Sequence, residues 1–127
     1  MARGIGSGTC DNLLNTFRNV SYSEAATYVQ LHTGDPGAAG TGNVSSVTTR
    51  PSISFSASSS GTLSASNTPQ WTNWAGTNGE TVNNITVWDA ASSGTFLWSA
   101  TLTTPKTINT GDTFTLSTCT LTITPAS

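Results

Sequence analysis

The chain is 127 residues long, has a formal net charge of −2 and contains only 8% charged residues, against about 25% in an average soluble domain. Its four basic residues are scattered along the sequence, which argues against direct binding of nucleic acid. No apolar run is long enough to predict a membrane span. Ser and Thr supply most of the polarity, and four Trp residues supply bulky apolar groups. We therefore expect one folded domain in which strands predominate.

The first twenty residues are predicted to form an arm and a short helix that precede the main domain. In residues 1–8, small side chains predominate, Ile5 offers an apolar anchor and Arg3 offers a charge. We expect this arm to order against a neighbouring copy, the alternative being a loose terminus. A chain that lacks residues 1–8 is therefore expected to fold normally but to bind its sister copies more weakly.

A helix is predicted from Cys10 to about Arg18, with Thr9 as its N-cap and Asn19 as its end. Its apolar residues recur at i, i+3, i+4 and i+7 and form a narrow stripe, which consists of Cys10, Leu13, Leu14 and Phe17. A helix of fewer than three turns is not stable alone in water. The stripe must therefore pack on the sheet or on another subunit.

Residues 21–127 are predicted to form an all-β domain. Short runs of alternating polar and apolar residues are separated by turns rich in Gly, Pro, Asn and Asp, which is typical of sandwiches and small barrels. We expect a small antiparallel β-sandwich or jelly-roll-like barrel of about eight strands. The expected strands lie at 27–32, 51–58, 62–66, 70–74, on both sides of a hairpin within 80–103, and at 106–108, 112–117 and 119–124.

The four Trp residues are expected to divide between the core and a contact surface. Segment 80–103 alternates on both sides of a Ser/Gly turn, which predicts a hairpin that places Trp88 and Trp98 in the core. Trp71 and Trp74 are three residues apart, so a regular strand would point them to opposite faces. One of them is therefore expected at a rim or a subunit contact, the alternative being a Trp that stacks on a sugar ring.

The titratable residues form no recognisable catalytic or metal-binding motif, so we expect neither an enzyme nor a bound cofactor or metal. His32 is the only histidine, and without a nucleophile motif we expect it to be a hydrogen-bonded surface residue. Asp35, Asp89 and Asp112 each lie in a turn that contains Gly. At such positions a carboxylate usually caps backbone N–H groups, which we prefer to calcium binding.

The two cysteines, Cys10 and Cys119, bear on the compartment in which the protein is made. The opening of the chain has no apolar segment typical of a signal peptide, so we expect synthesis and assembly in a cytoplasm. Two free thiols are expected in a reducing compartment, although the two residues could in principle pair.

Five segments follow one another in a distinctive order from the helix to near the C-terminus. They are ATYVQLHTGDPG at 26–37, VTTR at 47–50, TNGETV at 77–82, VWDAASSG at 87–94 and LTTPKTINTGD at 102–112. In this order and spacing the chain resembles a family of small actinobacteriophage virion proteins. Members of that family are labelled as tail fibre or minor structural proteins, and some are considered capsid decoration proteins. The resemblance brings no catalytic residues with it.

The resemblance implies a structural protein on the outer surface of the virion, assembled in the host cytoplasm. Our first hypothesis is a capsid decoration protein that binds the major capsid protein lattice and sister copies, as a homo-oligomer such as a trimer or a dimer. The alternative is a tail fibre or tail-tip protein that binds a glycan of the host cell envelope. No direct contact with nucleic acid or membrane is expected. The interaction surface is predicted to include Arg3, Ile5, Asp35, Pro36, Trp71 and Trp74.

Overall fold

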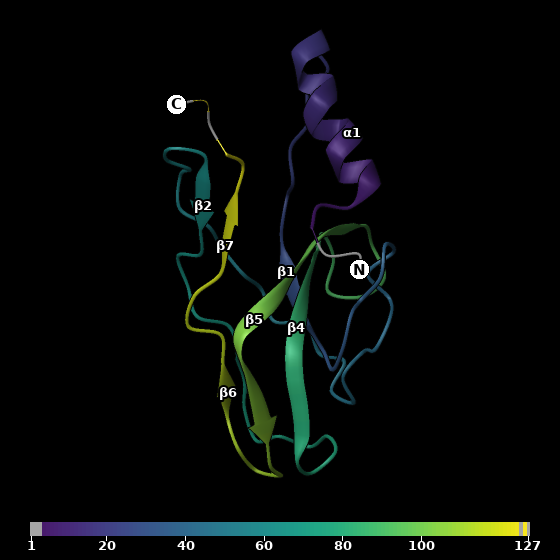
Figure 1. Ribbon diagram of the computed structural model, residues 1–127, viewed down its shortest axis with the longest axis vertical. Helices are drawn as coiled ribbons and strands as arrows, with labels where there is room; N and C mark the ends of the chain where they lie inside the picture. Colours follow the sequence, from purple (N-terminus) through teal and green to yellow (C-terminus); the bar gives the residue numbers. More distant parts are fainter. Residues whose placement is uncertain (1–3, 125, 127) are drawn as a thin grey trace.

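The computed structural model describes residues 4–124 and 126, and these form an elongated β-rich molecule with one helix at its end (Figure 1). The elements in chain order are helix α1 (Ser7–Asn15), the 3₁₀ turn η1 (Thr16–Arg18), and strands β1 (Tyr28–His32), β2 (Thr62–Ser64), β3 (Gln70–Trp71), β4 (Glu80–Trp88), β5 (Phe96–Ile108), β6 (Phe114–Thr115) and β7 (Thr120–Thr122). Every strand pair is antiparallel. The predicted class, a small antiparallel β-sandwich with one short N-terminal helix, is confirmed, with seven strands in the described residues where about eight were expected.

The predicted hairpin is the centre of the larger sheet, whose strand order is β1-β4-β5. Val29 of β1 lies opposite Val87 of β4, and Leu31 lies opposite Ile85. All four of these side chains are buried, and so are the two hairpin tryptophans. The alternation read from the sequence therefore placed the hairpin and its core side chains correctly.

Strand β5 is longer than predicted because it continues through an irregularity. Lys106 pairs with Val82, but the next paired residue of β5 is Thr101, which lies opposite Asn84. The residues between them therefore bulge from the ladder, and Pro105, which has no N–H to donate, falls in this bulge. The separate strand predicted at 106–108 is the far end of β5.

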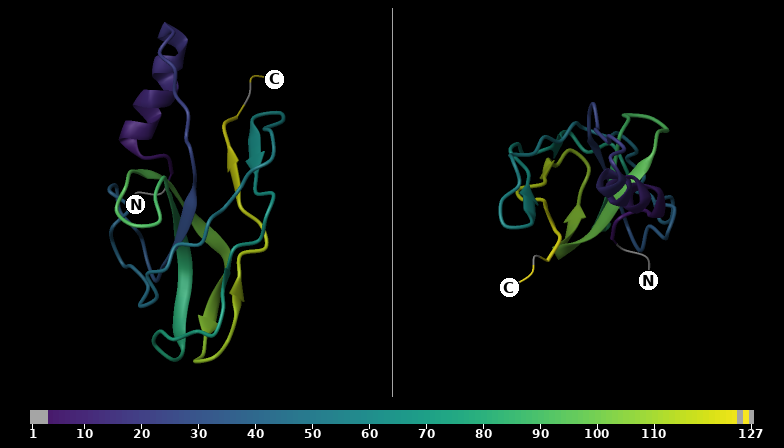
Figure 2. Two further views of the ribbon diagram at one scale, coloured as in Figure 1. Left: turned by 180° about the vertical axis from the view of Figure 1, so that it is seen from behind. Right: turned by 90° about the horizontal axis from the view of Figure 1, so that it is seen from above.

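Two short two-stranded sheets, β2-β7 and β3-β6, form the second layer, as the views in Figure 2 show. The segment 51–58 that leads toward them is extended but makes only isolated bridges, at Ser52 and Phe55, so the full strand predicted there is wrong. Its side chains still alternate as expected, with Ile53 buried and Phe55 half-buried. Trp71, Trp74 and Phe114 close the core from this side.

The three turn aspartates cap backbone N–H groups, as predicted. Asp35 Oδ1 accepts from Gly37 N at 2.9 Å, Asp89 Oδ1 accepts from Thr95 N at 2.7 Å, and Asp112 Oδ2 accepts from Asn109 N at 3.0 Å. Each carboxylate thus holds the backbone of its own loop.

Arg50 joins two of the segments that resemble the virion family, 47–50 and 87–94. Its Nη1 donates to the carbonyl oxygens of Ala90 at 3.0 Å and Ser93 at 2.7 Å, in the loop between β4 and β5. The guanidinium also lies 4.2 Å from the centroid of the Trp88 ring. Burial of the guanidinium lowers its pKa, and the charge of Asp89 opposes that shift. Arg50 therefore fastens the hairpin turn to the segment that precedes 51–58.

The start of the chain pairs with the edge of β5, which corrects the expectation of an arm that orders only against another copy. Gly6 N donates to Leu97 O at 2.8 Å, Ser99 N donates to Gly4 O at 2.9 Å, and Ile5 pairs with Trp98. A Cβ on Gly6 would lie 3.0 Å from Phe96 O, so the close approach favours Gly. Backbone pairing of this kind needs few apolar side chains, which is why the composition of the segment did not predict it.

Helix α1 begins directly after this pairing, three residues before the predicted start. Gly6 is its N-cap, with no side-chain cap. The predicted N-cap, Thr9, instead lies inside the helix and donates to Phe96 O at 3.2 Å. The α-helix itself ends at Asn15, earlier than predicted, and the 3₁₀ turn η1 continues to Arg18. Asn19, predicted as the terminator, is the C-cap of η1 and takes the left-handed conformation, at φ 65°, that terminates helices.

Candidate functional site

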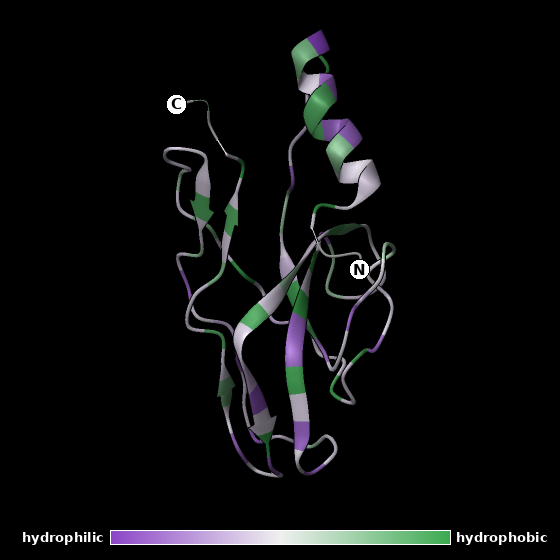
Figure 3. Ribbon diagram, in the orientation of Figure 1, coloured by the Kyte–Doolittle hydropathy of each residue, from purple (hydrophilic) through white to green (hydrophobic). Residues whose placement is uncertain are grey.

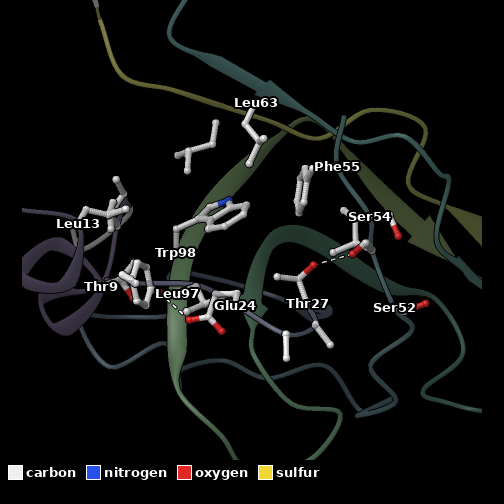
Figure 4. Close-up of a pocket in the computed structure, with 16 residues that line it drawn as sticks. Thr9, Leu13, Glu24, Thr27, Ser52, Ser54, Phe55, Leu63, Leu97 and Trp98 are labelled. Atoms are coloured by element: carbon white, nitrogen blue, oxygen red, sulfur yellow. Dashed lines mark hydrogen bonds between the residues drawn. The ribbon is translucent and has the colours of Figure 1, made fainter. Parts of the chain in front are cut away.

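A cleft of about 550 Å³ lies toward the end of the molecule to which α1 and the β2-β7 ribbon both project, from opposite sides (Figure 1). Leu13 of α1 lines one side, and Leu63 and Leu121 of the ribbon line the other. Leu97 and Trp98 of β5 also line it (Figure 4). This volume is in the range of sites that bury a compact apolar group. The walls come from segments far apart in the sequence, so the cleft could not be found from any one motif.

Trp98 lines the cleft and carries a buried polar atom with no partner among the described residues. Its side chain is 6% exposed, and its indole nitrogen is buried without a hydrogen-bond partner among the described residues. The ring lies 5.5 Å from that of Phe55, centroid to centroid, and the two rings are tilted by 52° (Figure 4). An unpaired buried N–H costs about 1–3 kcal/mol. This buried, unpaired donor therefore lowers the stability of the β5 wall, while the side chains that line the cleft are largely apolar.

Glu24 and Tyr22 give the rim of the cleft a negative charge. Glu24 is exposed, and its carboxylate accepts a hydrogen bond from the Tyr22 hydroxyl. Burial, together with this hydrogen bond and the carboxylate charge, raises the pKa of Tyr22 to about 12. The phenol is therefore protonated at neutral pH and remains a donor, so the negative charge of the pair stays on Glu24.

The apolar stripe of the helix is only partly used within the chain. The start of α1 contacts β5, but Leu14 is 64% exposed, Phe17 is 88% exposed and Val20, just beyond η1, is 46% exposed. Figure 3 shows hydrophobic bands along α1 out to its far end, away from the sheet. The first half of the prediction, packing on the chain's own sheet, therefore fails for this end of the helix.

His32 is buried, so the prediction that it lies at the surface is wrong, whereas the prediction that it is hydrogen-bonded is confirmed. Nδ1 lies 2.7 Å from Gly42 O, and Nε2 lies 2.7 Å from Thr86 Oγ1. A carbonyl only accepts, so Nδ1 carries the proton and Nε2 accepts from the Thr86 hydroxyl. Thr86 Oγ1 in turn accepts from Trp88 Nε1 at 2.7 Å. The imidazole is thus fully occupied by structural hydrogen bonds, and burial lowers its pKa.

The predicted interaction residues are dispersed, and three of them are buried in the chain itself. Trp71 and Trp74 lie in the core, so the prediction that one of them sits at a rim is wrong. Strand β3 ends at Trp71, and Asn73 takes a left-handed backbone at φ 50°, so the regular alternation does not extend to Trp74. Their indole nitrogens donate to Thr49 O at 3.0 Å and to Thr77 O at 3.1 Å, respectively, which satisfies both.

The other predicted residues are placed as follows. Pro36 is fully buried, and Asp35 beside it is partly exposed and caps its own turn. Ile5 is half-buried and lines the cleft. Arg3 lies outside the described residues. Sequence reasoning missed most of the cleft, and the unpartnered helical stripe was the one feature that pointed toward it.

The described residues contain neither a metal-binding cluster nor a membrane-spanning helix. Within residues 4–124 and 126, no group of three or more His, Cys, Asp or Glu side chains is placed to hold a metal ion. No helix in this part of the chain has the length and hydrophobicity needed to cross a membrane. Cys10 and Cys119 are both free thiols.

Comparison with known protein families gives the class first: a structural protein of a bacteriophage virion. The model of the family described as podophage GP4 fiber I protein gp80 matches residues 8–124, nearly the whole chain. The chain therefore belongs to this phage fibre family, and the predicted resemblance to virion proteins is confirmed at that level. Comparison with curated protein sequences finds no match.

Proposed function

We propose that this protein is a structural subunit of a fibre on the phage particle, held there by contacts with other proteins and without catalytic activity. The match to a fibre family over residues 8–124 is the observation that carries the proposal. The structure supports it in two ways. The polar groups with ordinary catalytic potential, such as His32 and the turn aspartates, are engaged in hydrogen bonds that hold the fold. Three of the five large apolar side chains that are exposed, Leu14, Phe17 and Val20, lie on or just beyond the helix at one end of the molecule, as attachment requires.

Decoration of the capsid surface, bound to the major capsid protein lattice, is the second candidate. It is favoured by the fold, a small sandwich with no repeated shaft segment among the described residues. The glycan-binding role considered for a tail-tip protein has less support, since all four tryptophans are buried and present no ring face to a sugar.

The copy number of the chain in purified particles tests the proposal. Quantitative mass spectrometry of intact virions, with the major capsid protein as internal standard, gives copies per particle. A fibre subunit is expected at a small fraction of the capsid protein. A copy number comparable with that of the capsid protein would assign the chain to the head surface instead, and its absence from particles would refute both candidates.

A further inference from the structure

We propose that the cleft between α1 and the β2-β7 ribbon receives the exposed end of the helix, Leu14 to Arg18, from a second copy of this chain. The inference goes beyond the proposed function, because both features exist whichever part of the virion the protein occupies. Each feature is incomplete alone. One is an apolar helix end with nothing packed on it, and the other is an apolar hollow of about 550 Å³.

The helix end supplies the apolar groups that the cleft lacks. Phe17, 88% exposed, and Leu14, 64% exposed, project from the last turns of the helix. Leu63, Leu121 and Leu97 line a hollow large enough for an aromatic ring and an aliphatic side chain together. An exposed aromatic anchor that enters an apolar pocket is the usual centre of a specific protein interface.

Charge also pairs the two surfaces. Arg18 follows Phe17 directly and is exposed, while Glu24 is exposed at the rim of the cleft. When Phe17 of one copy enters the cleft of another, its Arg18 is brought to this rim. The chain has a net charge of only −2, so little long-range repulsion opposes the approach of two copies. This opposite charge favours a second copy over an unrelated apolar partner.

The test is self-association of the full chain, measured by sedimentation velocity over a range of protein concentrations. The wild-type chain is expected to associate, and Phe17→Ser is expected to weaken association by about tenfold or more, as for loss of a buried aromatic anchor. Thermal melting of the variant as a monomer should be unchanged, because Phe17 is exposed. Val44→Ser, which removes an exposed apolar side chain on a loop outside the cleft lining, is the matched control and should leave association unaltered.

A charge exchange tests whether Arg18 of one copy lies beside Glu24 of the other. Arg18→Glu and Glu24→Arg are each expected to weaken association by about two- to fivefold, and the double variant should restore it. Failure of the double variant to recover association would overturn the contact proposed between Arg18 and Glu24 of two copies. A wild-type chain that is monomeric up to about 1 mM, the weak end of protein association, would overturn the second-copy assignment. So would association insensitive to Phe17→Ser, or use of the cleft by a different virion protein.

Discussion

Replacing each of two hairpin tryptophans by phenylalanine should have unequal effects on stability, because one indole N–H is satisfied and the other is not. Trp88 and Trp98 lie on neighbouring strands, and each is 6% exposed. Trp88 Nε1 donates to Thr86 Oγ1 at 2.7 Å, whereas Trp98 Nε1 has no partner in the described part of the chain. The same atoms are deleted at both sites, so the burial and cavity contributions largely cancel in the comparison.

The hydrogen bonds give the main part of the difference, and the Arg50 guanidinium over the Trp88 ring adds to it in the same direction, because Trp attracts a cation more strongly than Phe does. Trp98→Phe removes an unpaired buried donor, which relieves about 1–3 kcal/mol and offsets most of the cost of the lost atoms. Trp88→Phe loses a made hydrogen bond of about 0.5–1.5 kcal/mol in addition to its atoms. The free energy of unfolding should therefore fall further for Trp88→Phe, by roughly 1.5–4.5 kcal/mol more than for Trp98→Phe.

Urea unfolding of both variants, at a protein concentration where the chain is monomeric, measures this difference. The slope of free energy against urea should match the wild type in both cases, which shows that the unfolded reference is unchanged. Equal losses at the two sites, or a larger loss for Trp98→Phe, would show that the Trp98 N–H is satisfied in solution and would refute the reasoning.

Three further predictions follow from the N-terminal pairing, His32 and the thiols. Removal of residues 1–6 should lower the melting temperature, because it deletes the backbone bonds to β5; an unchanged melt would restore the idea of a free arm. Burial lowers the pKa of His32 in the folded chain, so as the pH falls the unfolded chain binds a proton at this residue before the folded chain does. The contribution of His32 to stability should therefore be complete above pH about 6.5 and should decline below it, by at most about 1.4 kcal/mol per pH unit. His32→Gln should flatten the profile between pH 7 and 5, and an unchanged slope would exclude His32 as its source. Without reductant, alkylation of the native chain should modify Cys10 faster than Cys119, because burial raises the pKa of the Cys119 thiol. Both thiols should react after unfolding, whereas a Cys10–Cys119 disulfide would prevent alkylation of both.

The parts of this fold that could be predicted from the sequence are those fixed by local pattern. The hairpin follows from period-two alternation, and the capped turns follow from Asp beside Gly, because each is determined within a few residues. The helix end was similarly marked by Asn19, which adopts the left-handed conformation as its residue type allows.

Apart from the irregular backbone at Asn73, which breaks the alternation between Trp71 and Trp74, the main errors arise where distant segments meet. His32 was expected at the surface, but the loop that carries Gly42 and Val44 covers the edge of β1 and buries it. The pairing of residues 4–6 with β5 uses backbone groups, which have no side-chain pattern. The cleft needs α1, β5 and the β2-β7 ribbon together, and only the unpartnered stripe on α1 indicated that a surface of this kind exists. A predicted domain boundary near residue 20 stays a prediction.

The proposed place of the protein on the virion can be tested most directly by locating it on intact particles. Purified virions labelled with gold-conjugated antibody raised against the full chain, and viewed by electron microscopy, show where the protein resides. A fibre subunit is expected to give label on the fibres and none over the capsid faces. Label spread over the capsid would place the chain on the head as a decoration protein. Particles that carry no label, from a preparation in which a capsid antibody labels normally, would contradict a role in the virion altogether.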